Sequence, residues 1–203
     1  LHPRVRRQRQ MCIRDSKTTE PIRNKKTIKA IEMYLKNTNF RNYCLFKTQL
    51  NSGLRISDIV KLKYDDAFDK NGNIKKHLSI VEKKTGKNRI IFINQELKQT
   101  FKELKNYYNL TQGKYFFCSR KGNNQPLTTT QVHRIYQNIG NIFNLKNFNS
   151  HSLRKTFCYY IYQKNKDINL IMKLMNHSST AITLRYIGIT DDDIDNIYSS
   201  LDF

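Results

Sequence analysis

The sequence predicts an α+β domain that is mainly α-helical and carries a small antiparallel sheet. Two observations lead to this fold class. Most apolar residues recur every three to four positions, as on one face of a helix, and one central stretch is rich in β-branched residues around a glycine turn. The 203 residues suit one domain with short appendages, and 38% apolar and 11% aromatic residues suffice for a core, which excludes wholesale disorder.

Helices account for most of the expected elements. Apolar residues at helical spacing predict two amphipathic helices before Gly53, through Ile28, Ile31 and Leu35, then Tyr43, Phe46 and Leu50. The same spacing predicts four later helices, at 94–108, 128–143, 152–164 and 168–176. Gly53 is expected to stop the second helix. Ser57 or Asp58 is expected to cap a short helix that contains Ile59, Val60 and Leu62. Ser150 and Asp167 are expected to cap the last two helices.

A hairpin is expected in the middle of the chain. Residues 77–93, HLSIVEKKTGKNRIIFI, contain two β-rich runs joined by 84–87, and 115–118 is a candidate for a further short strand. At the end of the chain, TDDDIDNIYSSL places acids in a first helical turn and repeats Ile194, Ile197 and Leu201 on one stripe. These patterns predict a sheet of antiparallel strands and a short terminal helix with an apolar face to dock.

The charge is strongly basic and unevenly distributed. The chain has 37 Lys and Arg against 16 Asp and Glu, a net charge of +21. Residues 1–19 hold six bases and one acid, and 191–203 hold five acids and no base. We therefore expect a flexible basic leader at 1–19, with a non-native origin as one explanation, a globular domain at 20–190 and an acidic C-terminal helix at 191–203. The body carries the excess charge, which favours a polyanionic partner over a merely soluble lysine-rich surface.

Other classes of protein are disfavoured. No run of 18 uncharged apolar residues and no hydrophobic signal core occur, so we expect no membrane span, no secretion and a cytoplasmic location. The four cysteines lack metal-ligand or CxxC spacing, so we expect free thiols rather than a zinc site or a disulfide framework: Cys12, Cys44, Cys118 and Cys158.

Four short segments hold the candidate functional residues. In SGLRISD, Arg55 follows a glycine turn, where its guanidinium could make paired contacts with phosphate oxygens, and Asp58 is interpreted as structural support. In the hairpin turn, Lys84 could reach into a DNA groove and donate a proton, although Lys83 and Lys87 are also candidates and the simpler interpretation is a basic turn on the phosphate backbone.

The other two segments lie in the C-terminal third. In HSLRKTF, His151 and Arg154 share one face at the start of a helix, beside amides that favour an anion. In LMNHSSTAITLRYIGIT, His177 ends one helix, Ser178 or Ser179 can cap the next, and Tyr186 follows. A phenol ionises near pH 10, so a nucleophilic Tyr186 needs neighbouring cations.

In this order, Arg55, Lys84, His151, Arg154, His177 and Tyr186 resemble the catalytic pattern of the tyrosine recombinase (phage integrase) family. The resemblance covers about residues 20–200. It implies the DNA breaking-rejoining fold of that family's catalytic domain and site-specific strand exchange on double-stranded DNA. It also implies an assembly of protomers, with a tetramer as one such state, and no cofactor. Basic neighbours of these motifs are expected to bind DNA: Lys83, Lys87, Arg89 and Lys155.

The resemblance also implies a role for each residue. Tyr186 would attack a phosphodiester to form a 3'-phosphotyrosine, Arg55 and Arg154 would bind the non-bridging oxygens, and Lys84 would protonate the 5'-oxygen. His151 would act as acid or base on the tyrosyl proton, and His177 would hydrogen-bond the phosphate. The additional N-terminal domain common in the family has no room here, so we expect a catalytic domain alone, either a minimal recombinase or part of a longer one. The alternatives are a type IB topoisomerase-like activity and a non-catalytic DNA-binding remnant of a mobile element.

Overall fold

The structure is a computed structural model that describes residues 19–84, 86–188 and 198–199. The expected basic leader, except Thr19, and the expected acidic terminal helix, except Tyr198 and Ser199, lie outside these residues. The same holds for Cys12. The described cysteines Cys44, Cys118 and Cys158 are free, as expected. Within the described residues, none of the helices has the length and apolar run that a bilayer span requires.

The described chain is mostly helical, with one hairpin. The helices are α1 Lys25–Thr38, α2 Phe40–Ser52, α3 Ile56–Ile59, α4 Tyr64–Ala67, α5 Gln95–Tyr108, α6 Thr129–Ile142, α7 Ser150–Asn165, α8 Ile168–Met175 and α9 Thr180–Ile187. The strands are β1 His77–Val81 and β2 Asn88–Phe92, which pair antiparallel with His77 opposite Phe92 and Val81 opposite Asn88. This confirms the mainly α fold with a small antiparallel sheet.

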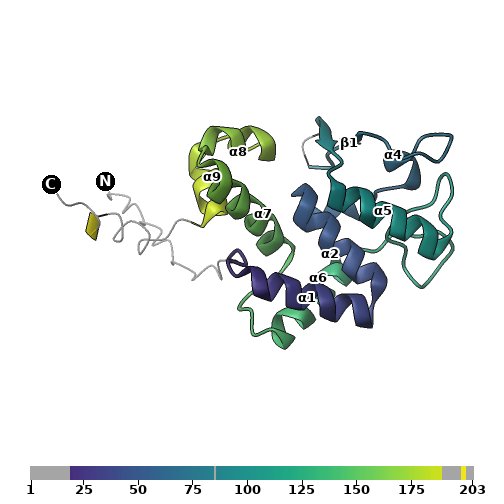
Figure 1. The fold of residues 1–203 in the computed structure, drawn as a ribbon, viewed down its shortest axis with the longest axis horizontal. Coiled ribbons are helices and arrows are strands. Elements are labelled where there is room, and N and C mark those ends of the chain that lie inside the picture. Colours follow the sequence, from purple (N-terminus) through teal and green to yellow (C-terminus); the bar gives the residue numbers. More distant parts are fainter. Residues whose placement is uncertain (1–18, 85, 189–197, 200–203) are drawn as a thin grey trace, which may run out of the picture.

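Two apolar clusters organise the fold. The larger one joins α1, α2, α5, α6 and the hairpin around fully buried side chains such as Phe46, Phe101 and Tyr136. The smaller one joins α7, α8 and α9 through Cys158, Ile171, Met175 and Ile187. Figure 1 shows α7, α8 and α9 grouped on one side of the molecule, with α1, α2 and α5 on the other. Arg154 of α7 is one of the side chains that link the two groups, and it donates to the carbonyl oxygen of Gly53 after α2.

The predicted helix ends at Gly53 and Asp167 are confirmed, and the predicted cap at Ser150 is wrong. Gly53 ends α2 in the left-handed conformation, with φ 59°, and its N–H donates to Gln49. Asp167 caps α8, and its carboxylate accepts from the N–H groups of Asn169 and Leu170. The cap of α7 is Asn149 rather than Ser150, because the Asn149 side chain accepts from the His151 N–H.

Two further predictions of local structure are wrong. Neither Ser57 nor Asp58 caps α3, since that helix begins at Ile56 with Arg55 in the cap position and no side-chain cap. The Asp58 carboxylate instead accepts from the N–H of Lys83 at 3.0 Å. Residues 115–118 do not form a strand, and only single bridges occur there, from Tyr115 to Lys63 and from Cys118 to Pro126. The four-residue helix α4 was not predicted.

Candidate active site

Arg154 is the most deeply placed residue of the candidate site. It lies one turn into α7, whose start is tied to α2 by a hydrogen bond from Gln49 Nε2 to the Ser150 carbonyl at 3.0 Å. Its Nη1 donates to the Gly53 carbonyl. Arg154 is only 1% exposed, and its Nε and Nη2 atoms have no acceptor among the described residues. Burial, which disfavours the charged form, lowers the pKa of the guanidinium.

Burying a guanidinium whose Nε and Nη2 lack hydrogen-bond acceptors is unfavourable unless an anion or another acceptor binds them. Arg154 lines a small cavity of about 150 Å³ together with Arg55 and His151. The ring of Tyr186 lies on another side, with its centroid 5.8 Å from the Arg154 Cζ. This places two arginines, a histidine and a tyrosine around one point, and the two open N–H groups suit a phosphate oxygen.

Arg55 is held by a residue that the sequence patterns did not single out. Its Nη1 donates to Oε2 of Glu82 at 2.9 Å, and Nη1 of Arg89 donates to the other oxygen, Oε1, at 3.0 Å. The Glu82 side chain is fully buried, and that of Arg55 is 21% exposed. Arg55 is therefore partly open to solvent while its position is set by a buried carboxylate. Asp58 supports the hairpin rather than this guanidinium.

The alternation of buried and exposed residues along β1 could have predicted from the sequence that Glu82 is buried. Leu78 is buried and Ile80 half-buried on β1, while His77, Ser79 and Val81 are exposed. Glu82 follows in the same two-residue phase as Leu78 and Ile80. An acid in phase with the buried face, next to a run of lysines, indicates a carboxylate that is paired inside the protein.

Lys84 lies in the hairpin turn, at the margin of the site. The side chain is exposed, and its charge is among those that lower the pKa of His151. Lys83 and Lys87 are exposed beside it. Arg89, an expected DNA contact, is engaged within the free chain, because its second nitrogen Nη2 donates to the carbonyl of Leu174 at 2.9 Å and its side chain is only 10% exposed.

His177 and Tyr186 are brought together by the turn between α8 and α9. Ser179 caps α9, as one of the two predicted candidates. The rings of His177 and Tyr186 have centroids 4.6 Å apart, tilted by 59°. His177 Nδ1 lies 3.0 Å from the hydroxyl of the buried Thr183, which fixes the imidazole against α9. Burial, followed by the charges of Arg154, Arg55 and Arg89, lowers the pKa of His177 to about 4.

His151 stands between the two arginines and the tyrosine. Besides the cavity with Arg55 and Arg154, it lines a second one of about 240 Å³ with Lys155, Arg185 and Tyr186. Burial, followed by the charges of Arg154, Lys84 and Arg55, lowers the pKa of His151. Both histidines of the site are therefore neutral at neutral pH in the free protein. Lys155 is half-buried and lies beside the second cavity.

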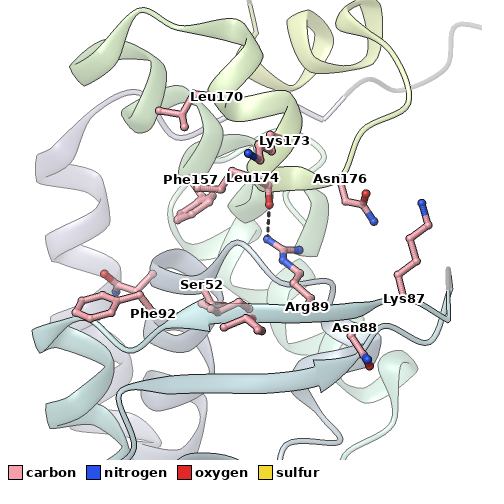
Figure 2. Close-up of a pocket in the computed structure, with 13 residues that line it drawn as sticks. Ser52, Lys87, Asn88, Arg89, Phe92, Phe157, Leu170, Lys173, Leu174 and Asn176 are labelled. Atoms are coloured by element: carbon pink, nitrogen blue, oxygen red, sulfur yellow. Dashed lines mark hydrogen bonds between the residues drawn. The ribbon is translucent and has the colours of Figure 1, made fainter.

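A larger cleft of about 590 Å³ lies on the other side of Arg89, between β2 and α8. Figure 2 shows Arg89 rising from β2 to the Leu174 carbonyl, with Phe92 and Leu170 farther along the cleft. The cleft combines apolar side chains with Lys87 and Lys173. Of the six expected catalytic residues, the structure groups Arg55, His151, Arg154, His177 and Tyr186, and it places Lys84 on the adjoining hairpin.

Solved structures establish the class of this fold. The chain superimposes on a XerA recombinase with a TM-score of 0.67 and 20% identity, covering 89% of this chain and 65% of that one. For a XerH site-specific recombinase in a post-cleavage complex with palindromic difH substrate, the TM-score is 0.69 at 20% identity, over 92% of this chain and 54% of that one. The fold is that of tyrosine recombinase catalytic domains.

The sequence comparison gives the family. The model of the phage integrase family matches residues 23–192, and the chain belongs to this family. It is 39% identical over 173 residues to the probable integrase/recombinase YoeC of Bacillus subtilis (strain 168), covering 85% of this chain and 91% of YoeC. It is 28% identical over 172 residues to the tyrosine recombinase XerH of Campylobacter jejuni, covering 83% of this chain and 47% of XerH. The chain thus spans most of YoeC but about half of XerH.

Proposed function

We propose that this chain is a site-specific DNA recombinase that cleaves and rejoins duplex DNA through a 3'-phosphotyrosine at Tyr186. The observation that carries the proposal is the buried Arg154 guanidinium, with two N–H groups that have no acceptor among the described residues and the Tyr186 ring 5.8 Å from its Cζ. A phosphodiester supplies the missing acceptors and the electrophile in one group. Family membership and the net charge of +21 support the same partner.

In the proposed cleavage step, the Tyr186 oxygen attacks phosphorus, and the bond from phosphorus to the 5'-oxygen breaks. The phenolic proton passes to His151, which is neutral near pH 7 because its pKa is lowered and can therefore accept it. Lys84 gives a proton to the departing 5'-oxygen, which takes the bonding electron pair. Arg55 and Arg154 stabilise the charge on the non-bridging oxygens.

His177 completes the phosphate site by a hydrogen bond from its imidazole. Attack by the 5'-hydroxyl of a partner strand reverses the step, so one phosphodiester replaces another and bond energy is kept. Arg154 Nε and Nη2, which lack acceptors among the described residues, are buried in the free protein. The site therefore has to open when DNA binds, so that the phosphate can reach these two nitrogens. Exchange between two duplexes needs more than one protomer, and we propose an assembly on DNA, with a tetramer as one such state.

The test uses nicked suicide duplexes drawn from the DNA that flanks the coding sequence of this chain. Covalent capture on denaturing gels is expected for wild type and lost completely in Tyr186→Phe, while the mobility shift on native gels stays within about twofold. Tyr107→Phe removes the same hydroxyl from an exposed ring on α5 and should leave capture unchanged.

An undiminished adduct in Tyr186→Phe would show that another residue is the nucleophile. A clear mobility shift without any adduct in wild type would favour the DNA-binding remnant instead. Two duplexes that both carry the cleaved site separate recombination from topoisomerase-like relaxation, because a recombinase exchanges strands between the two duplexes, whereas a topoisomerase relaxes a supercoiled plasmid and rejoins each duplex to itself.

A further inference from the structure

One buried carboxylate, that of Glu82, meets two arginines at the edge of the site. Its Oε2 accepts from Arg55 at 2.9 Å and its Oε1 from Arg89 at 3.0 Å, and the side chain has no exposure to solvent. A carboxylate in such a place is strongly unfavourable unless it is paired and hydrogen-bonded, and removing it leaves two cations close together without their counter-ion. The position of Arg55 therefore depends on Glu82.

The main chain of Glu82 also closes the turn that carries Lys84. Its N–H donates to the Lys87 carbonyl at 3.0 Å, and its carbonyl accepts from the N–H of Gly86 at 2.8 Å. Because backbone and side chain belong to one residue, the carboxylate fixes the orientation of the hairpin turn relative to Arg55.

Arg89 connects Glu82 to the end of α8, on the side of the site that carries His177. Its Nη2 donates to the Leu174 carbonyl in the last turn of α8, as Figure 2 shows. A cation at the C-terminus of a helix is favourable, because the last carbonyls lack partners within the helix. His177 follows Leu174 by three residues. A continuous chain of ion pairs and hydrogen bonds therefore joins the segments that carry Arg55, Lys84 and His177.

We propose that Glu82 is a positioning residue for DNA strand cleavage, which holds Arg55 at the phosphate site and fixes the Lys84 hairpin against α8 through Arg89. This inference rests on the proposed function, because it assigns Arg55, Lys84 and His177 to the cleavage step. Glu82 itself lies behind the two guanidinium groups and acts through them.

The proposal predicts a defect in rate rather than in DNA affinity. Glu82→Gln keeps the size of the side chain but removes the charge and one of the two acceptor oxygens, so Arg55 and Arg89 repel each other and one of them loses its acceptor. At saturating suicide duplex, we expect the first-order rate of adduct formation to fall roughly 10- to 100-fold, the range that a displacement of about 1 Å in a reacting group produces. The Kd for the same duplex should change by less than about threefold.

Two further variants complete the measurement. Glu103→Gln removes the same charge from α5, where Glu103 contacts Gln99, and should cleave at the wild-type rate. Glu82→Asp keeps the charge but is one methylene shorter and cannot span both guanidinium groups, so we expect an intermediate rate. Thermal melting establishes which variants are folded at the assay temperature. A readout that needs no cleavage is the ¹H–¹⁵N spectrum of the arginine Nε–H groups, in which the Arg55 and Arg89 signals should be sharp in wild type and broadened in Glu82→Gln.

The outcomes separate this inference from the proposed function. If wild type forms an adduct and folded Glu82→Gln forms it within twofold of the same rate, the positioning role is overturned. If Glu82→Gln does not fold, a wild-type rate for Glu82→Asp overturns it instead. If wild type forms no adduct on any duplex, the proposed function fails, and the arginine spectra then decide on Glu82. Unchanged Arg55 and Arg89 signals in Glu82→Gln would refute the proposal that Glu82 positions the two arginines, and broadened signals would support this proposal.

Discussion

The imidazole of His177 is surrounded by groups that oppose its protonation. Its burial, followed by the charges of Arg154, Arg55 and Arg89, lowers its pKa to about 4. In the unfolded chain a histidine has a pKa near 6.5. Between about pH 4 and 6.5, the unfolded state therefore binds a proton that the folded state does not.

This difference predicts a pH dependence of stability with a definite sign. The free energy of unfolding should rise as the pH increases from about 4 to about 6.5 and should lose this dependence above that range. His151, whose pKa is also lowered, contributes in the same direction. Urea unfolding at several pH values measures the slope. His177→Gln should reduce it, whereas His133→Gln, at an exposed position on α6, should leave it closer to that of wild type. Equal slopes for wild type and His177→Gln would contradict the assignment.

At the level of elements, the end of α2 and the start of α7 depend on each other at Gly53. Gly53 has φ 59°, and its carbonyl accepts from Arg154. A Cβ atom placed on Gly53 would lie 2.3 Å from Cδ1 of Phe157 on α7. The backbone conformation favours glycine, and the neighbouring ring leaves no room for a side chain. One position thus sets both the turn and the distance between the two helices.

Gly53→Ala is therefore expected to lower the free energy of unfolding by roughly 2–4 kcal/mol, from left-handed strain and overpacking together. Gly113→Ala is a matched control, because Gly113 also has a positive φ, of 76°, but a Cβ there meets nothing within 4 Å. It should lose only about 1 kcal/mol from the backbone conformation. Urea unfolding of both variants measures the difference, and equal losses would show that the Phe157 contact relaxes without cost.

The elements also show which features the sequence allows one to predict. Helical spacing and local caps such as Asp167 and Ser179 depend on neighbours in the chain, so they are visible in the sequence and the structure confirms them. Asp58 was misassigned as a cap because its carboxylate bonds to Lys83, 25 residues away. The inward orientation of Arg89 depends in part on a carbonyl 85 residues away, in Leu174. Such long-range partners have no signature in local spacing.

For the molecule as a whole, the net charge of +21 makes DNA affinity strongly dependent on salt. Each phosphate contact contributes about 0.9 to the slope of log K against log salt. Lys83→Gln on the hairpin should reduce the steepness of that slope by about 0.9 if this lysine contacts a phosphate. Lys102→Gln, on the exposed side of α5, should change it little. Mobility shifts at several salt concentrations provide the slopes. An unchanged slope for Lys83→Gln would show that Lys83 does not contact a phosphate.

The two described ends of the domain meet beside Tyr186. Ile22 donates its N–H to the Thr156 hydroxyl on α7 at 2.8 Å, and Arg23 Nη2 donates to the Gly188 carbonyl, two residues after Tyr186, at 2.6 Å. Thr19 lines the same cavity as Tyr186. Residues 19–23 therefore form part of the wall around Tyr186. A truncation that removes them would widen this cavity and leave the Gly188 carbonyl without its Arg23 donor, so a shortened chain for cleavage assays should begin ahead of Thr19.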